Sequence, residues 1–164
     1  RLSMKGMKSP QTMGELVVPE DLKLITAVHL DFGDNTFLIY DSKSDDPSAE
    51  RILIFASYSM RQRAALAREL YADGTYRAVS NIFATLYTIH TTIDNVSYPI
   101  FFILMPDERT RTFTKTFPVF NRYTHAFVNG CVVHVDCQLA AINAFRDVFD
   151  CDVRICLFHQ NQSV

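Results

Sequence analysis

Three β-rich segments joined by short links restrict the fold of this chain more than any other feature. Residues 71–79, 84–93 and 97–106 are rich in Val, Ile, Thr, Tyr and Phe, the residue types that favour strands. The pair Asp94-Asn95 separates the second and third segments and is typical of a tight turn. A parallel connection needs a crossover of roughly a dozen residues, and these links are shorter. The three segments are therefore predicted to form an antiparallel meander.

After the meander, predicted helices and strands alternate. Residues 108–117 read as a helix that Pro118 ends or kinks, and residues 131–136 read as a short buried strand. Residues 137–149 are predicted to form a second helix with one broad apolar side, and residues 152–158 are predicted to form a last strand. Strands separated by helices favour parallel, right-handed connections. The expected fold is α/β: a mixed five-stranded sheet, with the antiparallel meander followed by parallel strands, and flanking helices.

The part of the chain before the meander divides into two stretches. Residues 1–20 carry Gly and Pro among polar residues and are expected to be a flexible lead-in. Residues 21–70 are expected to form a β-rich segment and a helix, which Ser59 caps and which runs to Leu70. Residues 71–164 then form the core. The strands expected before the core are residues 24–32, 36–41 and 51–57.

Length and composition set outer bounds on what the chain does. Its 164 residues suit one domain, and a net charge of −2 counts against nucleic-acid binding by this segment alone. The chain starts at Arg1 rather than Met and is predicted to be a piece of a longer protein. All four cysteines are read as reduced thiols of an intracellular protein. They are Cys131, Cys137, Cys151 and Cys156.

Two aspartates are the candidate catalytic and metal-binding residues. Asp73 lies within or at the start of the first meander strand, and Asp136 lies at the C-terminal end of the fourth strand. Chemistry in open α/β sheets gathers beyond the carboxyl ends of strands, and oxygen ligands suit Mg²⁺ or Mn²⁺. Each residue also fits a purely structural role, because Asp-Gly is a common turn pair and Asp is a common helix N-cap.

A resemblance of whole segments favours the metal-binding interpretation. In chain order, several blocks resemble the transposase domain of Mutator-like elements (MULE), a member of the ribonuclease-H-like superfamily. An Asp-Gly-Thr-aromatic motif is followed by two strand blocks, an Asp leading into an Ala-rich helix, and a Cys-x-x-His element. These blocks are residues 71–76, 84–93, 98–106, 134–149 and 154–159, and the resemblance covers about residues 36–164.

The resemblance implies that Asp73 and Asp136 are the first two acids of an Asp-Asp-Glu triad for DNA strand cleavage and transfer. It implies Mg²⁺ or Mn²⁺ as the cofactor, with two metal ions only in the complete core. It also implies DNA as the partner through the full-length protein, self-association, and a nuclear location. The family's third acid is a Glu on a later helix, and no Glu follows Glu108 here. The chain is therefore expected to stop before the third acid and to be inactive alone.

Three further residues are candidates for positions near the site. His134 alternates with Asp136 on one strand, so both side chains are expected on the same face, with His134 beside the metal or as an ordinary half-buried histidine. Cys156 and His159 have zinc-ligand spacing but supply only half of a structural zinc site. The simpler interpretation is a buried Cys156 and a His159 that caps the strand, while the resemblance places the pair near the active site. Cys137 stands where many members of the family have an aromatic residue.

Two functions of different classes follow from the sequence. The first is the front part of a metal-dependent DNA transposase core. The second is a domesticated, catalytically inactive domain that serves as a DNA-associated regulatory or protein-interaction module. A Glu on a predicted helix downstream of Val164 in the full-length protein would favour the first, and its absence would favour the second.

Overall fold

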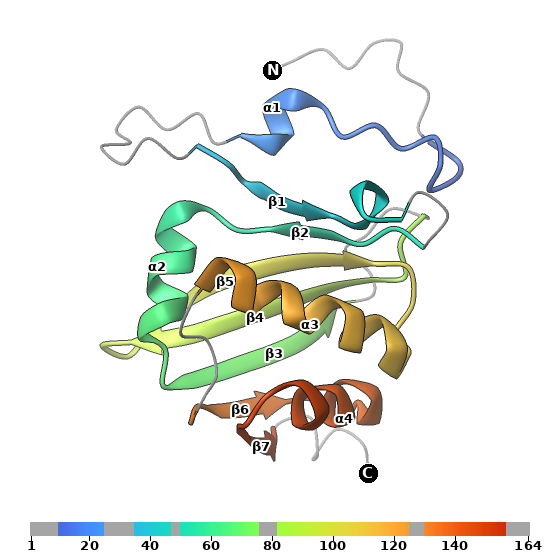
Figure 1. The fold of residues 1–164 in the computed structure, drawn as a ribbon. Coiled ribbons are helices and arrows are strands. Elements are labelled where there is room, and N and C mark those ends of the chain that lie inside the picture. The colour runs from blue at the N-terminus through green and yellow to red at the C-terminus, as the bar shows by residue number, and fades with distance from the viewer. Residues whose placement is uncertain (1–9, 25–34, 47–49, 76–81, 125–129, 157–164) are drawn as a thin grey trace.

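The computed structural model describes residues 10–24, 35–46, 50–75, 82–124 and 130–156. Within these ranges the strands form one mixed sheet, and the helices lie before, between and after them in the chain (Figure 1). The elements are α1 (Glu20–Lys23), β1 (Leu38–Asp41), a 3-10 turn η1 (Ser42–Ser44), β2 (Leu53–Phe55), α2 (Tyr58–Leu66), β3 (Glu69–Thr75), β4 (Thr85–Ile93), β5 (Val96–Met105), α3 (Thr110–Thr124), β6 (Val132–Val135), α4 (Leu139–Val148) and β7 (Asp152–Ile155). No helix in the described part of the chain is long and apolar enough to cross a membrane.

The described residues form a seven-stranded sheet in the order β1-β2-β5-β4-β3-β6-β7. Strands β3, β4 and β5 are the predicted antiparallel meander, while β6 lies parallel to β3, and β7 lies parallel to β6. The α/β class and the mixture of antiparallel and parallel strands are therefore confirmed. The predicted count of five strands is wrong, because β2 pairs antiparallel with the outer edge of β5 and β1 pairs with β2.

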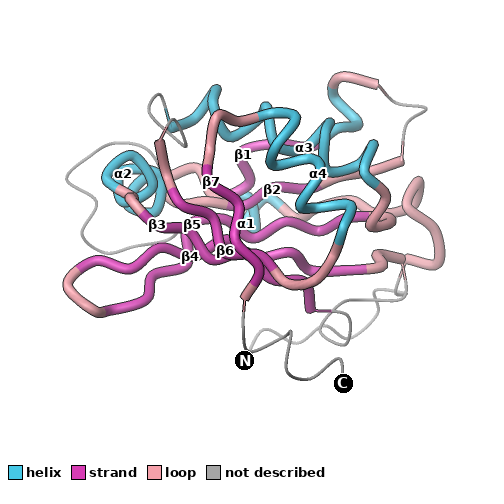
Figure 2. The backbone as a smooth tube through the Cα atoms, turned by 90° about the horizontal axis from the view of Figure 1, so that it is seen from below, coloured by secondary structure: helices cyan, strands magenta, loops and turns pink. Residues whose placement is uncertain are grey.

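Helices α3 and α4 cover one face of the sheet (Figure 2). The rings of Phe113, Phe117 and Phe120 on α3 and of Phe145 on α4 are all 0% exposed. Phe117 and Phe145 join the two helices with a ring-centroid distance of 4.2 Å. Successive side chains of a strand point to opposite faces, so the other face of β3 and its neighbours is free of these helices.

The helix before the core is shorter than predicted and begins earlier. The N-cap of α2 is Ser57 rather than Ser59, because the Ser57 hydroxyl accepts a hydrogen bond from the backbone N–H of Met60. The helix ends at Leu66, and Leu70 belongs to β3, where it is fully buried. The alternation of buried and exposed residues from Glu69 onward is a strand pattern.

Pro118 does not end α3, contrary to one of the two outcomes predicted for it. The helix runs from Thr110 to Thr124 with Pro118 inside it. Proline removes a single backbone hydrogen bond here, while Phe117 and Val119 on either side of it are buried in the core. Packing against α4 and the sheet therefore keeps this stretch helical.

The tight turn between β4 and β5 is confirmed. Asp94 and Asn95 have φ angles of 52° and 62°, the left-handed backbone that two-residue hairpin turns require. The strand predicted for residues 24–32 falls almost entirely outside the described residues, of which only Leu24 is placed there, in an isolated bridge to Thr36.

Candidate functional site

Asp73 and Asp136 each directly follow the last paired residue of two neighbouring parallel strands, β3 and β6. Ala72 of β3 pairs with Val135 of β6 in parallel, and each aspartate is the next residue along its strand direction. Neighbouring strands lie about 4.8 Å apart. The fold thus places two half-buried aspartates, far apart in the sequence, at the same end of adjacent strands.

A hydrogen-bonded loop holds the carboxylate of Asp136. The backbone N–H of Gln138 donates to Asp136 Oδ1 at 3.3 Å. The side-chain amide of Gln138 donates to Glu108 Oε2 at 2.6 Å. Gln138 therefore ties the loop after β6 to the loop before α3.

Glu108 is a third carboxylate at this end of the sheet, and sequence reasoning did not single it out. A Cβ placed on Gly74, the residue after Asp73, would lie 3.8 Å from Glu108 Oε1 and 3.5 Å from Thr85 Oγ1. Gly74 is on the face that carries Leu70 and α3, whereas Asp73 belongs to the opposite face. Glu108 and Asp73 therefore approach this end of β3 from different sides.

Three oxygen donors do not converge on one point in the described part of the chain. No group of three or more His, Cys, Asp and Glu side chains there is arranged to hold a metal ion. Asp73 and Asp136 are a pair of carboxylates with the donor chemistry that Mg²⁺ and Mn²⁺ prefer. Mg²⁺ is commonly held by one or two carboxylates, with water filling its other positions, so the residues present fit such an ion.

Beside Asp73, the face of the sheet opposite α3 and α4 has a hollow of about 180 Å³. It lies over β3, β4 and β6, because Asp73 pairs with Thr88 and Tyr71 pairs with both His90 and His134. The rings of Tyr71 and His134 are stacked, with centroids 4.8 Å apart and an interplanar angle of 8°. The residues that line the hollow are Tyr71, Ala72, Asp73, Thr88, His90, His134 and Cys156.

Two of the three residues predicted near the site line this hollow. His134 and Cys156 do so, and the backbone N–H of Cys156 donates to Val135 O at 2.7 Å. His159 lies outside the described residues, so the pairing of Cys156 with His159 stays a prediction. The thiol of Cys137 is exposed. Cys151 is half-buried, and burial raises the pKa of its thiol to about 11.

His90 makes the stability of this region depend on pH. Burial lowers the pKa of its imidazole below the ordinary 6.5, and the nearby carboxylate of Asp73 offsets part of this effect. The unfolded chain therefore takes up a proton at a pH at which His90 of the folded chain stays neutral. The contribution of neutral His90 to stability is complete above the pKa of the unfolded chain, and it is lost as the pH falls through the pKa of the folded chain. We expect the free energy of unfolding to fall from about pH 7.5 to about pH 5.5, and to fall less in His90→Gln. Urea unfolding at both pH values checks this, and an equal fall in both proteins would contradict it.

Comparisons with known proteins add no family to this picture. No protein-family model matches the chain, and no curated protein matches it. The sequence motifs and the geometry of the described residues are therefore the basis for any functional conclusion.

Proposed function

We propose that this chain is the front part of a ribonuclease-H-like transposase core similar to that of Mutator-like elements. In the full-length protein, this core cuts and transfers DNA strands with Mg²⁺ or Mn²⁺. The observation that carries the proposal is the parallel pairing of Ala72 with Val135, after which Asp73 and Asp136 are the next residues on adjacent strands.

The strand arrangement supports the proposal. The meander β3-β4-β5, extended by the parallel strands β6 and β7, has the strand order and directions expected of a ribonuclease-H-like core. The positions of the motifs that resemble the transposase family are compatible with such a core. The Asp-Gly-Thr motif is in β3, and the second Asp follows β6 and leads into α4.

Each residue of the proposed site has a distinct task. Asp73 and Asp136 supply the carboxylate oxygens that hold the divalent cation. A divalent cation held there would supply Lewis-acid chemistry for activating a water and stabilising the leaving oxygen of a phosphodiester. Gln138 orients Asp136 through its backbone N–H and braces that loop against Glu108.

A titration with Mn²⁺ tests the carboxylate pair directly. We expect weak binding by the chain, and at least tenfold weaker binding in Asp73→Asn and in Asp136→Asn, because each change removes one of two charged ligands. Asp147→Asn, at an exposed position of α4, is the matched control and should bind like the original protein. Isothermal calorimetry and Mn²⁺ electron paramagnetic resonance measure the affinities. Equal uptake by Asp136→Asn and the original chain would refute the proposed site.

A second candidate function is a domesticated module without catalysis. It is favoured by the lack of a third converging donor among the described residues and by the net charge of −2. Strand-transfer assays on the full-length protein separate the two candidates. Mg²⁺-dependent transfer that Asp73→Asn abolishes supports the enzyme, and DNA association without cleavage supports the module.

A further inference from the structure

Helix α2 and the two residues after it form a basic stretch of the chain. Residues 57–68 contain Arg61, Arg63 and Arg68 and no Asp or Glu. We call these three residues the α2 arginines. Helix α2 lies beside the C-terminal end of α3 (Figure 1), where Arg61 Cζ is 5.9 Å from the ring centroid of Tyr123. Arg63 and Arg68 form no ion pair with a carboxylate of the described residues.

The acidic residues that flank this stretch in the sequence are engaged elsewhere. Glu50 Oε2 lies 3.0 Å from Arg111 Nη2, near the start of α3. Glu69 accepts a hydrogen bond from the Tyr71 hydroxyl at 2.8 Å. Both of these β3 residues alternate with the buried Leu70, so they belong to the face of the sheet opposite α3. Neither flanking carboxylate therefore offsets the positive charge of the α2 arginines.

Tyrosine rings hold two of the guanidinium groups in place. Arg63 Cζ lies 4.8 Å from the ring centroid of Tyr98, and Arg63 Nη1 donates to Ser59 O at 3.4 Å. Arg61 Cζ lies 5.8 Å from the ring centroid of Tyr58. A guanidinium placed over a ring keeps N–H groups at its edge for an anion, and a side chain that is already ordered loses little freedom on binding. The two groups are thus positioned before any ligand binds.

This basic stretch and the carboxylate pair lie on different sides of the sheet. Tyr98 pairs with Thr91, and Thr91 pairs with Leu70 on the face that the helices cover. Arg63, over the ring of Tyr98, is therefore on the side of α3 and α4, whereas Asp73 belongs to the opposite face. The two sites can be tested separately.

We propose that the α2 arginines bind phosphate groups of a DNA backbone without regard to base sequence. A guanidinium suits phosphate because it can donate two parallel N–H bonds to its oxygens. DNA carries one negative charge per about 1.7 Å of helix axis, so separate arginines along one stretch can meet several phosphates at once. The inference goes beyond the proposed function, because it adds a surface that holds DNA away from the carboxylate pair and needs no metal ion.

Fluorescence anisotropy of a labelled DNA duplex, measured in EDTA over a series of salt concentrations, tests this inference. Three phosphate contacts predict that the logarithm of the affinity falls with the logarithm of the salt concentration with a slope of about −2.7. Arg61→Gln, Arg63→Gln and Arg68→Gln should each weaken binding about three- to tenfold at low salt. Each should also make the slope shallower by about 1, whatever the base sequence of the duplex.

Two further variants separate the geometry of the contact from the charge of the protein. Arg63→Lys keeps the charge but lacks the planar fork, so it should keep the salt slope and bind about threefold more weakly. Arg146→Gln removes the same charge from an exposed position in the last turn of α4. It is the matched control and should bind the duplex like the original protein. The melting temperature of each variant shows that it is folded.

Three results would overturn the inference. The first is no binding of the duplex at low salt, or an affinity and slope that the triple change of Arg61, Arg63 and Arg68 to Gln leaves unaltered. The second is a loss as large in Arg146→Gln as in Arg63→Gln. The third is displacement of the duplex by polyglutamate at equal charge concentration, which would assign the surface to an acidic protein.

The carboxylate site is judged by a separate measurement. Asp73→Asn should bind the duplex no more weakly than the original protein in EDTA, because it adds no negative charge and lies on the other face. Mn²⁺ uptake without DNA binding contradicts the arginine surface and leaves the carboxylate site intact. DNA binding in EDTA by a chain that takes up no Mn²⁺ has the opposite meaning.

Discussion

Phe117→Ala is expected to lower the free energy of unfolding by about 3–5 kcal/mol, enough to unfold much of a marginally stable domain. Phe117 is 0% exposed in the middle of α3. Its ring centroid lies 4.2 Å from that of Phe145 and 5.5 Å from that of Phe113, with two further rings within 6 Å. Removing the ring leaves a cavity between α3, α4 and the sheet that these large neighbours cannot readily fill.

Phe102→Ala is the matched control for this loss. Phe102 is on β5 but is only half-buried, and it lies on the face away from α3, where it lines an open apolar groove. Because its ring already contacts solvent, we expect a smaller loss, below about 2 kcal/mol. Urea unfolding followed by far-UV circular dichroism measures both variants. Equal losses would mean that the cluster around Phe117 is not the main core of the domain.

Much of the sheet could be predicted because its signals are local. The strand-rich composition of residues 84–93 and 97–106, with Asp94-Asn95 between them, fixes a hairpin without any long-range information. The alternation of later helices and strands then favours parallel pairing. The pairing of β2 with β5 had no local signal, because β2 and β5 are about fifty residues apart and either edge of the meander could accept a strand.

Helix ends were harder to predict than strands, for a physical reason. Ser57 and Ser59 are equally good caps by composition, and only the chain path after β2 decides between them. Pro118 is a strong helix breaker in isolation, yet the burial of Phe117 and Val119 outweighs the loss of one hydrogen bond.

The candidate site, like the fold, could be predicted from the sequence only in part. The sequence assigned Asp73 to the first meander strand and Asp136 to the end of the fourth strand, but it did not pair these two strands, which only the parallel register of Ala72 with Val135 shows. Glu108 could not be placed in advance, because its position depends on how the loop between β5 and α3 folds back toward Gly74. The hollow needs three strands in register, so only the assembled sheet reveals it.

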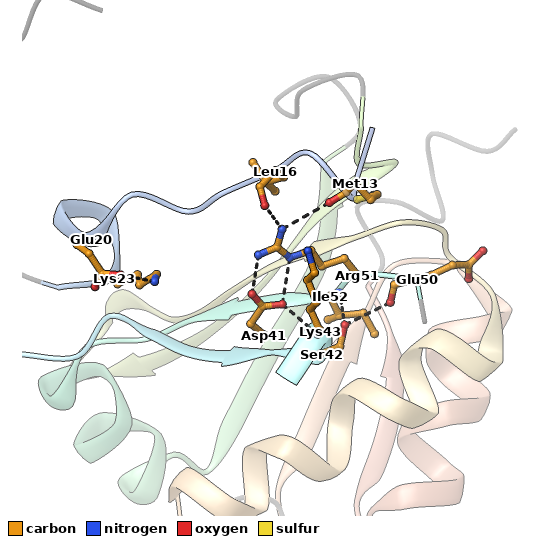
Figure 3. Close-up of polar contacts among 10 residues, drawn as sticks. All are labelled: Met13, Leu16, Glu20, Lys23, Asp41, Ser42, Lys43, Glu50, Arg51 and Ile52. Carbon is orange, nitrogen blue, oxygen red and sulfur yellow. Dashed lines mark hydrogen bonds and ion pairs between the residues drawn. The ribbon is translucent and has the colours of Figure 1, made fainter. Parts of the chain in front are cut away.

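The salt bridge between Arg51 and Asp41 anchors the segment before α1 to the sheet (Figure 3). The Arg51 guanidinium donates to both carboxylate oxygens of Asp41, at 3.0 and 2.6 Å, and also to the backbone carbonyls of Leu16 and Met13. The side chain of Arg51 is 7% exposed and that of Asp41 is 19% exposed. Burial alone raises the pKa of Asp41, but hydrogen bonds from Arg51 and from the N–H of Lys43 bring it below its ordinary value.

Arg51→Met is expected to lower the free energy of unfolding by about 3 kcal/mol, because it takes the opposite charge away from a mostly buried carboxylate and the guanidinium donor away from two carbonyls. Asp41→Asn in the same chain should recover part of the loss by removing the unpaired charge. Arg154→Met breaks an exposed pair with Asp152, at 2.8 Å, and should change stability by less than about 1 kcal/mol. Urea unfolding gives the three values, and limited proteolysis should show faster cleavage within residues 10–23 only where Arg51 is lost. A loss no larger in Arg51→Met than in Arg154→Met would show that this bridge does not hold the segment.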